Sequence, residues 1–438
     1  MKKAAFHNLG CKVNAYETEA MQQLFEENGF ETVPFSEKAD VYVVNTCTVT
    51  NMADRKSRQM LHRARKNNPD AVVIAAGCYV QEKEGHVDSC IDIIVGNNRK
   101  KDIIEILREY EKEHRGSRAF DSGDFYDGRI NISHAGEYEE LRLGKTAEHT
   151  RAYIKVQDGC NQFCSYCIIP FARGRVRSRR PESVLDEVRT LAGKGYKEIV
   201  LTGIHLSSYG ADFKEEGETL LPLIEKVHGV DGIERIRLGS LEPGIITEEF
   251  AVRLSSLRKV CPHFHLSLQS GCNATLKRMN RRYTKEEYYE KCVLLRKYFD
   301  NPALTTDVIV GFPGETQEEF EESRAFIDQA DFYETHIFKY SRREGTKAAG
   351  MPGQVPEEEK ARRSAILLEM SRKKEKAYER MLIGTSRKVL VEEESIMDGE
   401  TYQVGHTMEY VKIRQKSEKN QINQIINVEI ESHLQIIH

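Results

Sequence analysis

Short apolar runs alternate with helical patterns through about the first hundred residues of the chain. Brief apolar runs bounded by turn residues predict buried strands, and a 3.6-residue period predicts helices. An alternation of the two predicts a parallel sheet covered by helices. The predicted strands are Ala4–Phe6, Val41–Val44, Val72–Ala75 and Ile91–Val95, and the predicted helices are Glu17–Glu27 and Arg55–Lys66.

A second alternation begins at Tyr153, after residues 116–145, which are rich in Gly, Asp, Arg and Glu and predict a linker. Six strand–helix units are too few to close an eight-stranded barrel. We therefore expect a partial (β/α)6 barrel, with its site at the C-terminal ends of the strands. Its predicted strands are Tyr153–Val156, Glu198–Leu201, Arg235–Leu238, Phe264–Leu268, Thr305–Val310 and Thr335–Lys339.

The pattern changes again after a charged helical stretch, Pro356–Arg380. Short apolar segments separated by turn residues predict a small β-barrel, an architecture that often binds oligonucleotides. The chain is therefore expected to be an α/β protein with domains at 1–115, 146–375 and 376–438. The last domain's predicted strands are Lys388–Val391, Tyr402–Val404, Tyr410–Ile413, Ile425–Ile430 and Leu434–Ile437.

Composition limits the partners and the cellular location expected for the protein. The 438 residues carry a net charge of −4, so any nucleic-acid site must be a local basic patch. His7 and Asn8 interrupt the first apolar stretch, and no uncharged apolar run reaches the roughly 18 residues of a membrane span. We expect a cytoplasmic protein without a membrane partner. Ten cysteines in such a chain favour metal binding or catalysis over a disulfide framework.

Three of these cysteines, Cys160, Cys164 and Cys167, fall in the loop after the first strand of the second domain. Three thiolates on one loop can ligate three irons of a [4Fe-4S] cluster and leave the fourth iron open. In radical S-adenosylmethionine (SAM) enzymes, SAM occupies that iron, and one electron splits it to give a 5′-deoxyadenosyl radical. The alternative is structural zinc, which needs four ligands, and no fourth Cys or His follows at finger spacing.

Neighbouring residues are candidates for binding SAM. Tyr166, between the last two cysteines, is expected to pack against the adenine, unless it is an ordinary loop aromatic. Thr202 and Gly203 end the second strand, and Val310 and Gly311 end the fifth. Glycine at these ends lets the backbone approach a ligand closely, and a plain turn is the alternative.

Cys11, Cys47 and Cys78 each follow an apolar strand of the first domain. Because parallel strands end at the same edge of a sheet, these thiols are expected to converge and to hold a second cluster with an open iron. Simple core packing is the alternative, since free cysteine is often a small buried apolar residue. We interpret the remaining four cysteines as structural; they are Cys90, Cys261, Cys272 and Cys292.

Several motifs together resemble the methylthiotransferases, and the resemblance spans essentially the whole chain. It implies a methylthiotransferase domain, a radical SAM domain and a C-terminal TRAM domain that binds RNA. The motifs are Gly10-Cys11-Lys12-Val13-Asn14, Asn45-Thr46-Cys47, Gly77-Cys78, the Cys160 loop running into Ile168-Ile169-Pro170, Gly311-Phe312-Pro313-Gly314-Glu315-Thr316 and Tyr340-Ser341-Arg342-Arg343-Glu344-Gly345-Thr346.

Two stretches look like the branch that acts on N6-threonylcarbamoyladenosine (t6A) of tRNA. They are Lys12-Val13-Asn14 followed by Tyr16-Glu17-Thr18, and Cys167 to Arg175. The branch acting on isopentenyladenosine usually shows Gln-Met-Asn and then Asp-Ser-Glu, which this chain lacks. The implied partners are tRNA carrying t6A at position 37, an external electron donor and a sulphur source.

The resemblance also implies a mechanism with two [4Fe-4S] clusters. One SAM would methylate a sulphur held at the Cys11/Cys47/Cys78 cluster. A second SAM at the Cys160/Cys164/Cys167 cluster would yield the radical that opens the C2–H bond of adenosine 37, since acid–base chemistry alone cannot thiolate that carbon.

An arginine-rich stretch follows the cluster loop. We expect Arg173, Arg175 and Arg177 to hold tRNA phosphates or to stack on bases, with a solvated charged surface as the alternative. Other acceptors stay open: isopentenyladenosine in tRNA, or an aspartate of a ribosomal protein. A non-catalytic iron-sulphur sensor that binds RNA is the alternative from another class.

Overall fold

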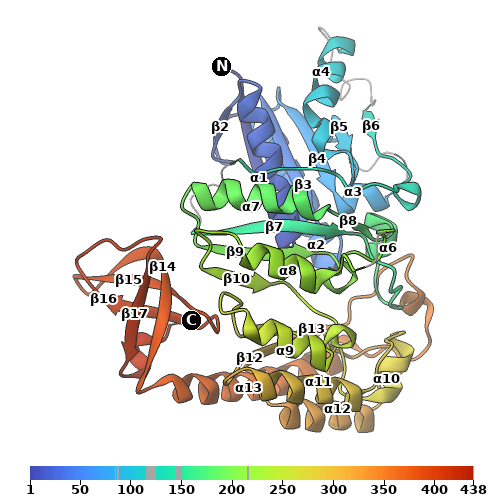
Figure 1. Cartoon of the computed structure of the whole chain (residues 1–438). Coiled ribbons are helices and arrows are strands. Elements are labelled where there is room, and N and C mark those ends of the chain that lie inside the picture. The colour runs from blue at the N-terminus through green and yellow to red at the C-terminus, as the bar shows by residue number, and fades with distance from the viewer. Residues whose placement is uncertain (84, 86–87, 115–124, 145–149, 215–216, 438) are drawn as a thin grey trace.

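The computed structural model describes the whole chain except residues 84, 86–87, 115–124, 145–149, 215–216 and 438. Its first domain is built on a parallel sheet with the strand order β2-β1-β3-β4-β5-β6 (Figure 1). The four predicted strands are confirmed, and two three-residue strands, too short to give a pattern, were missed. The strands are β1 Lys3–Asn8, β2 Glu31–Val33, β3 Val41–Thr46, β4 Val72–Gly77, β5 Ile93–Val95 and β6 Tyr126–Gly128.

Helices cover both faces of this sheet, which explains why its central strands are apolar throughout. On one face, Met21 and Phe25 of α1 (Lys12–Glu27) pack with α4 (Ile103–Glu113) against the strands. On the other face, Leu61 of α2 (Asn51–Asn67) packs with the short α3 (Cys78–Glu82). The last strand, β6, lies in the stretch expected as a linker and pairs with β5.

The second domain is an open barrel of six parallel strands, as predicted. β7-β9-β10 and β11-β12-β13 form two ladders, which parallel bridges at Ile236–Val260 and Leu241–Leu266 connect. A two-residue strand, β8 (Arg177–Ser178), pairs antiparallel to β7. The barrel strands are β7 Arg151–Asp158, β9 Glu198–Gly203, β10 Arg235–Leu238, β11 His263–His265, β12 Ala303–Val310 and β13 Glu334–Lys339.

Side chains alternate along these strands between two environments. Residues such as Ile154, Ile199 and Leu304 belong to the apolar core under the outer helices. Their neighbours Lys155, Glu198 and Thr305 point to the other face, which makes the barrel interior polar. The surrounding helices are α6 Ile169–Arg173, α7 Pro181–Gly193, α8 Leu220–His228, α9 Glu248–Ser256, α10 Asn273–Arg278, α11 Lys285–Tyr298, α12 Gln317–Ala330 and α13 Glu357–Leu382.

The C-terminal domain is an antiparallel sheet in the order β16-β15-β14-β17. The predicted segment Leu434–Ile437 is a short turn instead of a strand, and its Ile436 bridges to Ile413 of β16. Within the residues that the structure describes, no helix has the length and apolar character needed to cross a bilayer. The strands are β14 Thr385–Met397, β15 Glu400–Thr407, β16 Lys412–Lys416 and β17 Ile425–Ile430.

A buried carboxylate, Glu198, lies where the C-terminal domain meets the barrel. Arg151 and Arg237 donate hydrogen bonds to it at 3.1 and 2.9 Å, and both guanidinium groups lie over the ring of Tyr410. Burial by itself would raise the pKa of Glu198, but the arginines lower it to about 2. The domains are therefore joined by an ion cluster from which solvent is excluded.

Glu198→Gln is expected to destabilise the protein by about 3–5 kcal/mol, because the buried Arg237 and Arg235 lose their counter-charge and Arg151 is left with Glu392 alone. The folded pKa of about 2 lies below the usual 4.5, so this contribution is complete above about pH 4.5 and is lost as the pH falls towards 2. Denaturation of wild type and variant across this pH window measures it. Glu234→Gln, which breaks the exposed pair with Lys197, is the control and should cost under about 1 kcal/mol. Equal losses in both variants would contradict the assignment.

Candidate functional site

The cysteines of the first domain converge at one edge of its sheet. Cys11 caps the start of α1, Cys47 follows β3, and Cys78 begins α3. A β-carbon at Gly10, where φ is +102°, would lie 2.9 Å from the Sγ of Cys47, so only glycine permits this approach. Burial raises the pKa of the Cys47 thiol to about 11, and the nearby Cys78 and Cys11 thiols add to the effect.

The cysteines of the barrel lie on the loop between β7 and α6, at the C-terminal ends of the strands. Cys167 donates its backbone N–H to the carbonyl of Cys164, and Gln162 donates its backbone N–H to the Sγ of Cys160. Arg281, which the sequence analysis did not single out, donates to the Sγ of Cys164 at 3.3 Å. Donors of this kind stabilise anionic sulphur, as metal-bound thiolates require.

A buried ion cluster joins the two groups of cysteines. Glu17 of α1 accepts from Lys100 and Lys155 at 2.7 Å and from Arg173 of α6 at 2.8 Å, and every one of these side chains is fully buried. Arg173 also donates to the Sγ of Cys78 at 3.2 Å. Burial would raise the pKa of Glu17, but the three cations lower it well below its usual value.

A second contact between the domains comes from the loop after β13. Arg343 donates to Asp54 at 2.8 Å and to the hydroxyl of Thr48, one residue after Cys47. Beside it lies a cavity of about 250 Å³ between the first domain and the barrel. Its lining includes Val49, Thr50, Tyr166, Gln269, Asp307 and Tyr340. The cavity adjoins both cysteine-bearing segments, so a small molecule there would meet residues of both.

The arginine stretch after the cluster loop departs from expectation. Arg173 and Arg177 are 0% and 1% exposed, and Asp158 lies 3.2 and 3.8 Å from them. They are therefore part of the interior and do not present their charge to tRNA phosphates, because each meets a buried carboxylate. Arg175 is exposed and lies over the ring of Phe163. Its role as an RNA contact stays a prediction.

The predicted SAM-binding residues fall into two groups. Tyr166 lines the cavity, and its ring meets Phe312 edge-on. Thr202 is buried on the interior face of β9, whereas Val310 belongs to the apolar core of the barrel. A β-carbon at Gly203 or Gly311 would meet a side chain of the protein, Gln157 or Lys360, and the expected contact of these glycines with SAM stays a prediction.

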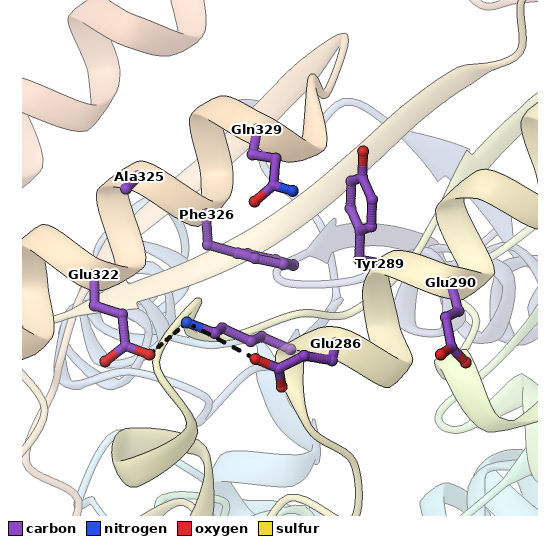
Figure 2. Close-up of a pocket in the computed structure, with 8 residues that line it drawn as sticks. Glu286, Tyr289, Glu290, Glu322, Ala325, Phe326 and Gln329 are labelled. Carbon is purple, nitrogen blue, oxygen red and sulfur yellow. Dashed lines mark hydrogen bonds and ion pairs between the residues drawn. The ribbon is translucent and has the colours of Figure 1, made fainter.

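A larger hollow of about 400 Å³ lies on the outside of the barrel, between α11 and α12 (Figure 2). Lys285 lines it and pairs with Glu322 at 2.5 Å, while Tyr289 and Phe326 form its apolar wall. No cysteine lines it. This hollow is separate from the site described above.

Two protein-family models match separate parts of the chain. Residues 154–327 match the radical SAM superfamily, and residues 3–96 match a family described as uncharacterized protein family UPF0004. Among solved structures, the radical SAM methyltransferase TsrM from Kitasatospora setae is similar, with a TM-score of 0.59, 16% identity and coverage of 79% of this chain and 74% of that one. At that identity the likeness is one of fold.

Curated relatives match over nearly the whole length. The threonylcarbamoyladenosine tRNA methylthiotransferase MtaB of Bacillus subtilis is 43% identical, covering 98% of this chain and 94% of its own. The MtaB of Aquifex aeolicus is 39% identical over 91% of this chain and 95% of its own. A tRNA-2-methylthio-N(6)-dimethylallyladenosine synthase of Moorella thermoacetica is 36% identical over 89% of this chain and 87% of its own.

The open barrel and the three-cysteine loop after its first strand define a radical SAM protein. With relatives this similar over both the barrel and the first domain, the chain belongs to the radical SAM methylthiotransferase family.

Glu17→Gln is expected to lower the free energy of unfolding by about 3–5 kcal/mol, because three buried cations lose the charge that they share. Hydrogen exchange should rise in α1 and α6, which the cluster joins. Denaturation and exchange measured by mass spectrometry test both effects. The control, Glu31→Gln on the exposed edge strand β2, should leave stability and exchange near those of wild type.

Proposed function

We propose that this protein inserts a methylthio group at C2 of N6-threonylcarbamoyladenosine at position 37 of tRNA. One observation carries the proposal: two three-cysteine groups on separate domains, with Arg173 reaching from the helix that follows one group to Cys78 of the other. The similarity to the two MtaB proteins supports t6A as the acceptor.

Each group of cysteines fits a [4Fe-4S] cluster with one open iron. Cys160, Cys164 and Cys167 would hold one cluster, and Cys11, Cys47 and Cys78 the other, with Arg281, Arg173 and Asn97 donating to their sulphurs. When bound, the clusters and SAM supply a methylated sulphur and a radical able to open an aromatic C–H bond.

The chain's own residues organise the reacting groups. Tyr166 and Thr202 would position SAM, Tyr166 from the cavity wall and Thr202 from the barrel interior, whereas Gly203, Val310 and Gly311 would act through their backbone alone. The Glu17 cluster and the Arg343–Asp54 pair hold the first domain on the barrel. That contact keeps bulk water away from Cys78, which is 4% exposed.

An exposed patch beside the cluster loop suits single-stranded RNA. Phe171 is 53% exposed and meets Phe163 edge-on, and Arg175 lies 4.5 Å above the Phe163 ring. Aromatic faces beside a guanidinium group stack with unpaired bases. We assign this patch, with the C-terminal domain, to the anticodon loop of the tRNA substrate. The reaction also needs an external electron donor and a sulphur source.

The acceptor is tested with purified protein carrying both clusters, SAM, a reductant, a sulphur source and tRNA bearing t6A or isopentenyladenosine. Mass spectrometry of the digested nucleosides should show a methylthio gain on t6A alone. A gain on isopentenyladenosine would give the protein the activity for which the Moorella thermoacetica relative is named. SAM cleavage without either product would point to another acceptor, such as a ribosomal aspartate, and no cleavage to a sensor.

Cysteine variants separate the roles of the two clusters. Cys164→Ser should lose about four irons per chain, together with SAM cleavage and product. Cys47→Ser should also lose about four irons and all product, but it should still cleave SAM. Cys292→Ala, at a buried cysteine of α11 away from both groups, is the control for iron content and activity. Full iron in Cys47→Ser would refute the second cluster.

A further inference from the structure

Lys12 is a cation without a counter-ion next to the proposed second cluster. It is the first residue of α1, follows Cys11 directly and has an exposed side chain. Among the residues that the structure describes, it makes no hydrogen bond and no ion pair. An exposed lysine on an outer surface needs no partner, so the position of Lys12 in the fold decides whether the missing counter-ion is significant.

Lys12 faces the polar interior of the barrel. α1 packs against β7 and β9, and so brings its first turn to the barrel strands. Lys12 lies near enough to His263 of β11 and His336 of β13 for its charge to act on both imidazoles: after burial and Arg237 it helps to lower the pKa of His263, and it opposes the rise that Glu334 causes in the pKa of His336. The residue after Cys11 therefore extends from the cysteine edge of the first domain towards the barrel strands.

The position is electrostatically unfavourable for a lysine. The N-terminus of a helix carries a partial positive charge, and α1 has no acidic residue in its first turn to offset it. Arg237 and Arg151 of the barrel lie near enough to repel the charge of Lys12, and the attraction of Glu198 does not outweigh them. Helix stability does not explain a cation here, and an added anion would relieve the repulsion.

The acids of the interior are already matched with other partners. Glu198 is shared by Arg151 and Arg237, Glu334 lies 3.3 Å from His336, and Asp307 lies 3.4 Å from His265. Within the described chain, none of these carboxylates forms an ion pair with Lys12. A ligand that enters between the two domains is the remaining source of negative charge.

We infer that Lys12 binds the carboxylate of the threonyl group of t6A and thereby selects this nucleoside. The inference rests on the proposed function. C2 and C6 flank the same ring nitrogen of adenine, and C6 carries the substituted N6, so a base whose C2 meets a sulphur beside Cys11 carries its N6 group close to the next residue. The threonyl group ends in a carboxylate, and an isopentenyl group offers no charge.

Removing the charge of Lys12, or the charge of the threonyl carboxylate, tests the contact between them. Wild type, Lys12→Gln and Lys12→Arg, each with both clusters, are assayed on tRNA carrying t6A or its methyl ester at position 37. Lys12→Gln is expected to raise KM for t6A about 10- to 100-fold, the value of a charged hydrogen bond. The ester should cost wild type the same factor and Lys12→Gln nothing more, and Lys12→Arg should recover most of the loss.

Two controls keep the outcome specific. Lys194→Gln removes an exposed charge at the end of α7 and should leave KM unchanged, which excludes a general loss of attraction to RNA. Iron content and SAM cleavage without RNA should be the same in all variants. Equal losses by Lys12→Gln on both substrates, or no loss, would overturn the inference alone. A wild type that modifies isopentenyladenosine and not t6A would overturn the proposed function with it.

Discussion

The carboxylate of Glu17 is the point on which the arrangement of the first two domains depends. It is fully buried and is shared by Lys100 of the first domain, Lys155 of β7 and Arg173 of α6. Docking the domains in a different arrangement would bury at least one of these charges without its partner, and an unpaired buried charge is strongly destabilising. The cluster therefore acts as a geometric constraint: the domains dock in the one arrangement in which all the charges are matched.

The site follows from this constraint. A parallel sheet brings Cys11, Cys47 and Cys78 to one edge, and a single loop holds Cys160, Cys164 and Cys167, but neither arrangement says where the other lies. Arg173 connects them. It is the last residue of α6, the helix that follows the cluster loop, and it pairs with Glu17 and donates a hydrogen bond to the Sγ of Cys78. The same docking produces the cavity lined by Tyr166 and Thr50 and brings Lys12 near Arg151 and Arg237 of the barrel.

The C-terminal domain is attached by similar chemistry at another junction. Glu198 gathers the arginines of β7 and β10, and Tyr410 lies between those arginines and the rings of His263 and His406. The sequence analysis placed Tyr410 in a predicted strand of an RNA-binding domain. In the structure its ring contacts Arg151, Arg237 and His263 of the barrel. The RNA-binding surface that we propose for this domain would therefore be formed by other residues.

The sequence by itself determined the features that depend on local pattern. The six barrel strands, the central strands of the first sheet and the cysteine loop could be predicted because periodicity and spacing act over a few residues. The tertiary structure decided what long-range pairing controls. Arg173 and Arg177 appear in the sequence as an exposed basic run, and their burial depends on Asp158 and on Glu17, which is 156 residues from Arg173. The sequence shows that a residue is charged but does not show where its side chain points. Only packing determines whether that side chain meets solvent, a buried carboxylate or, as for Lys12, the interior of a neighbouring domain.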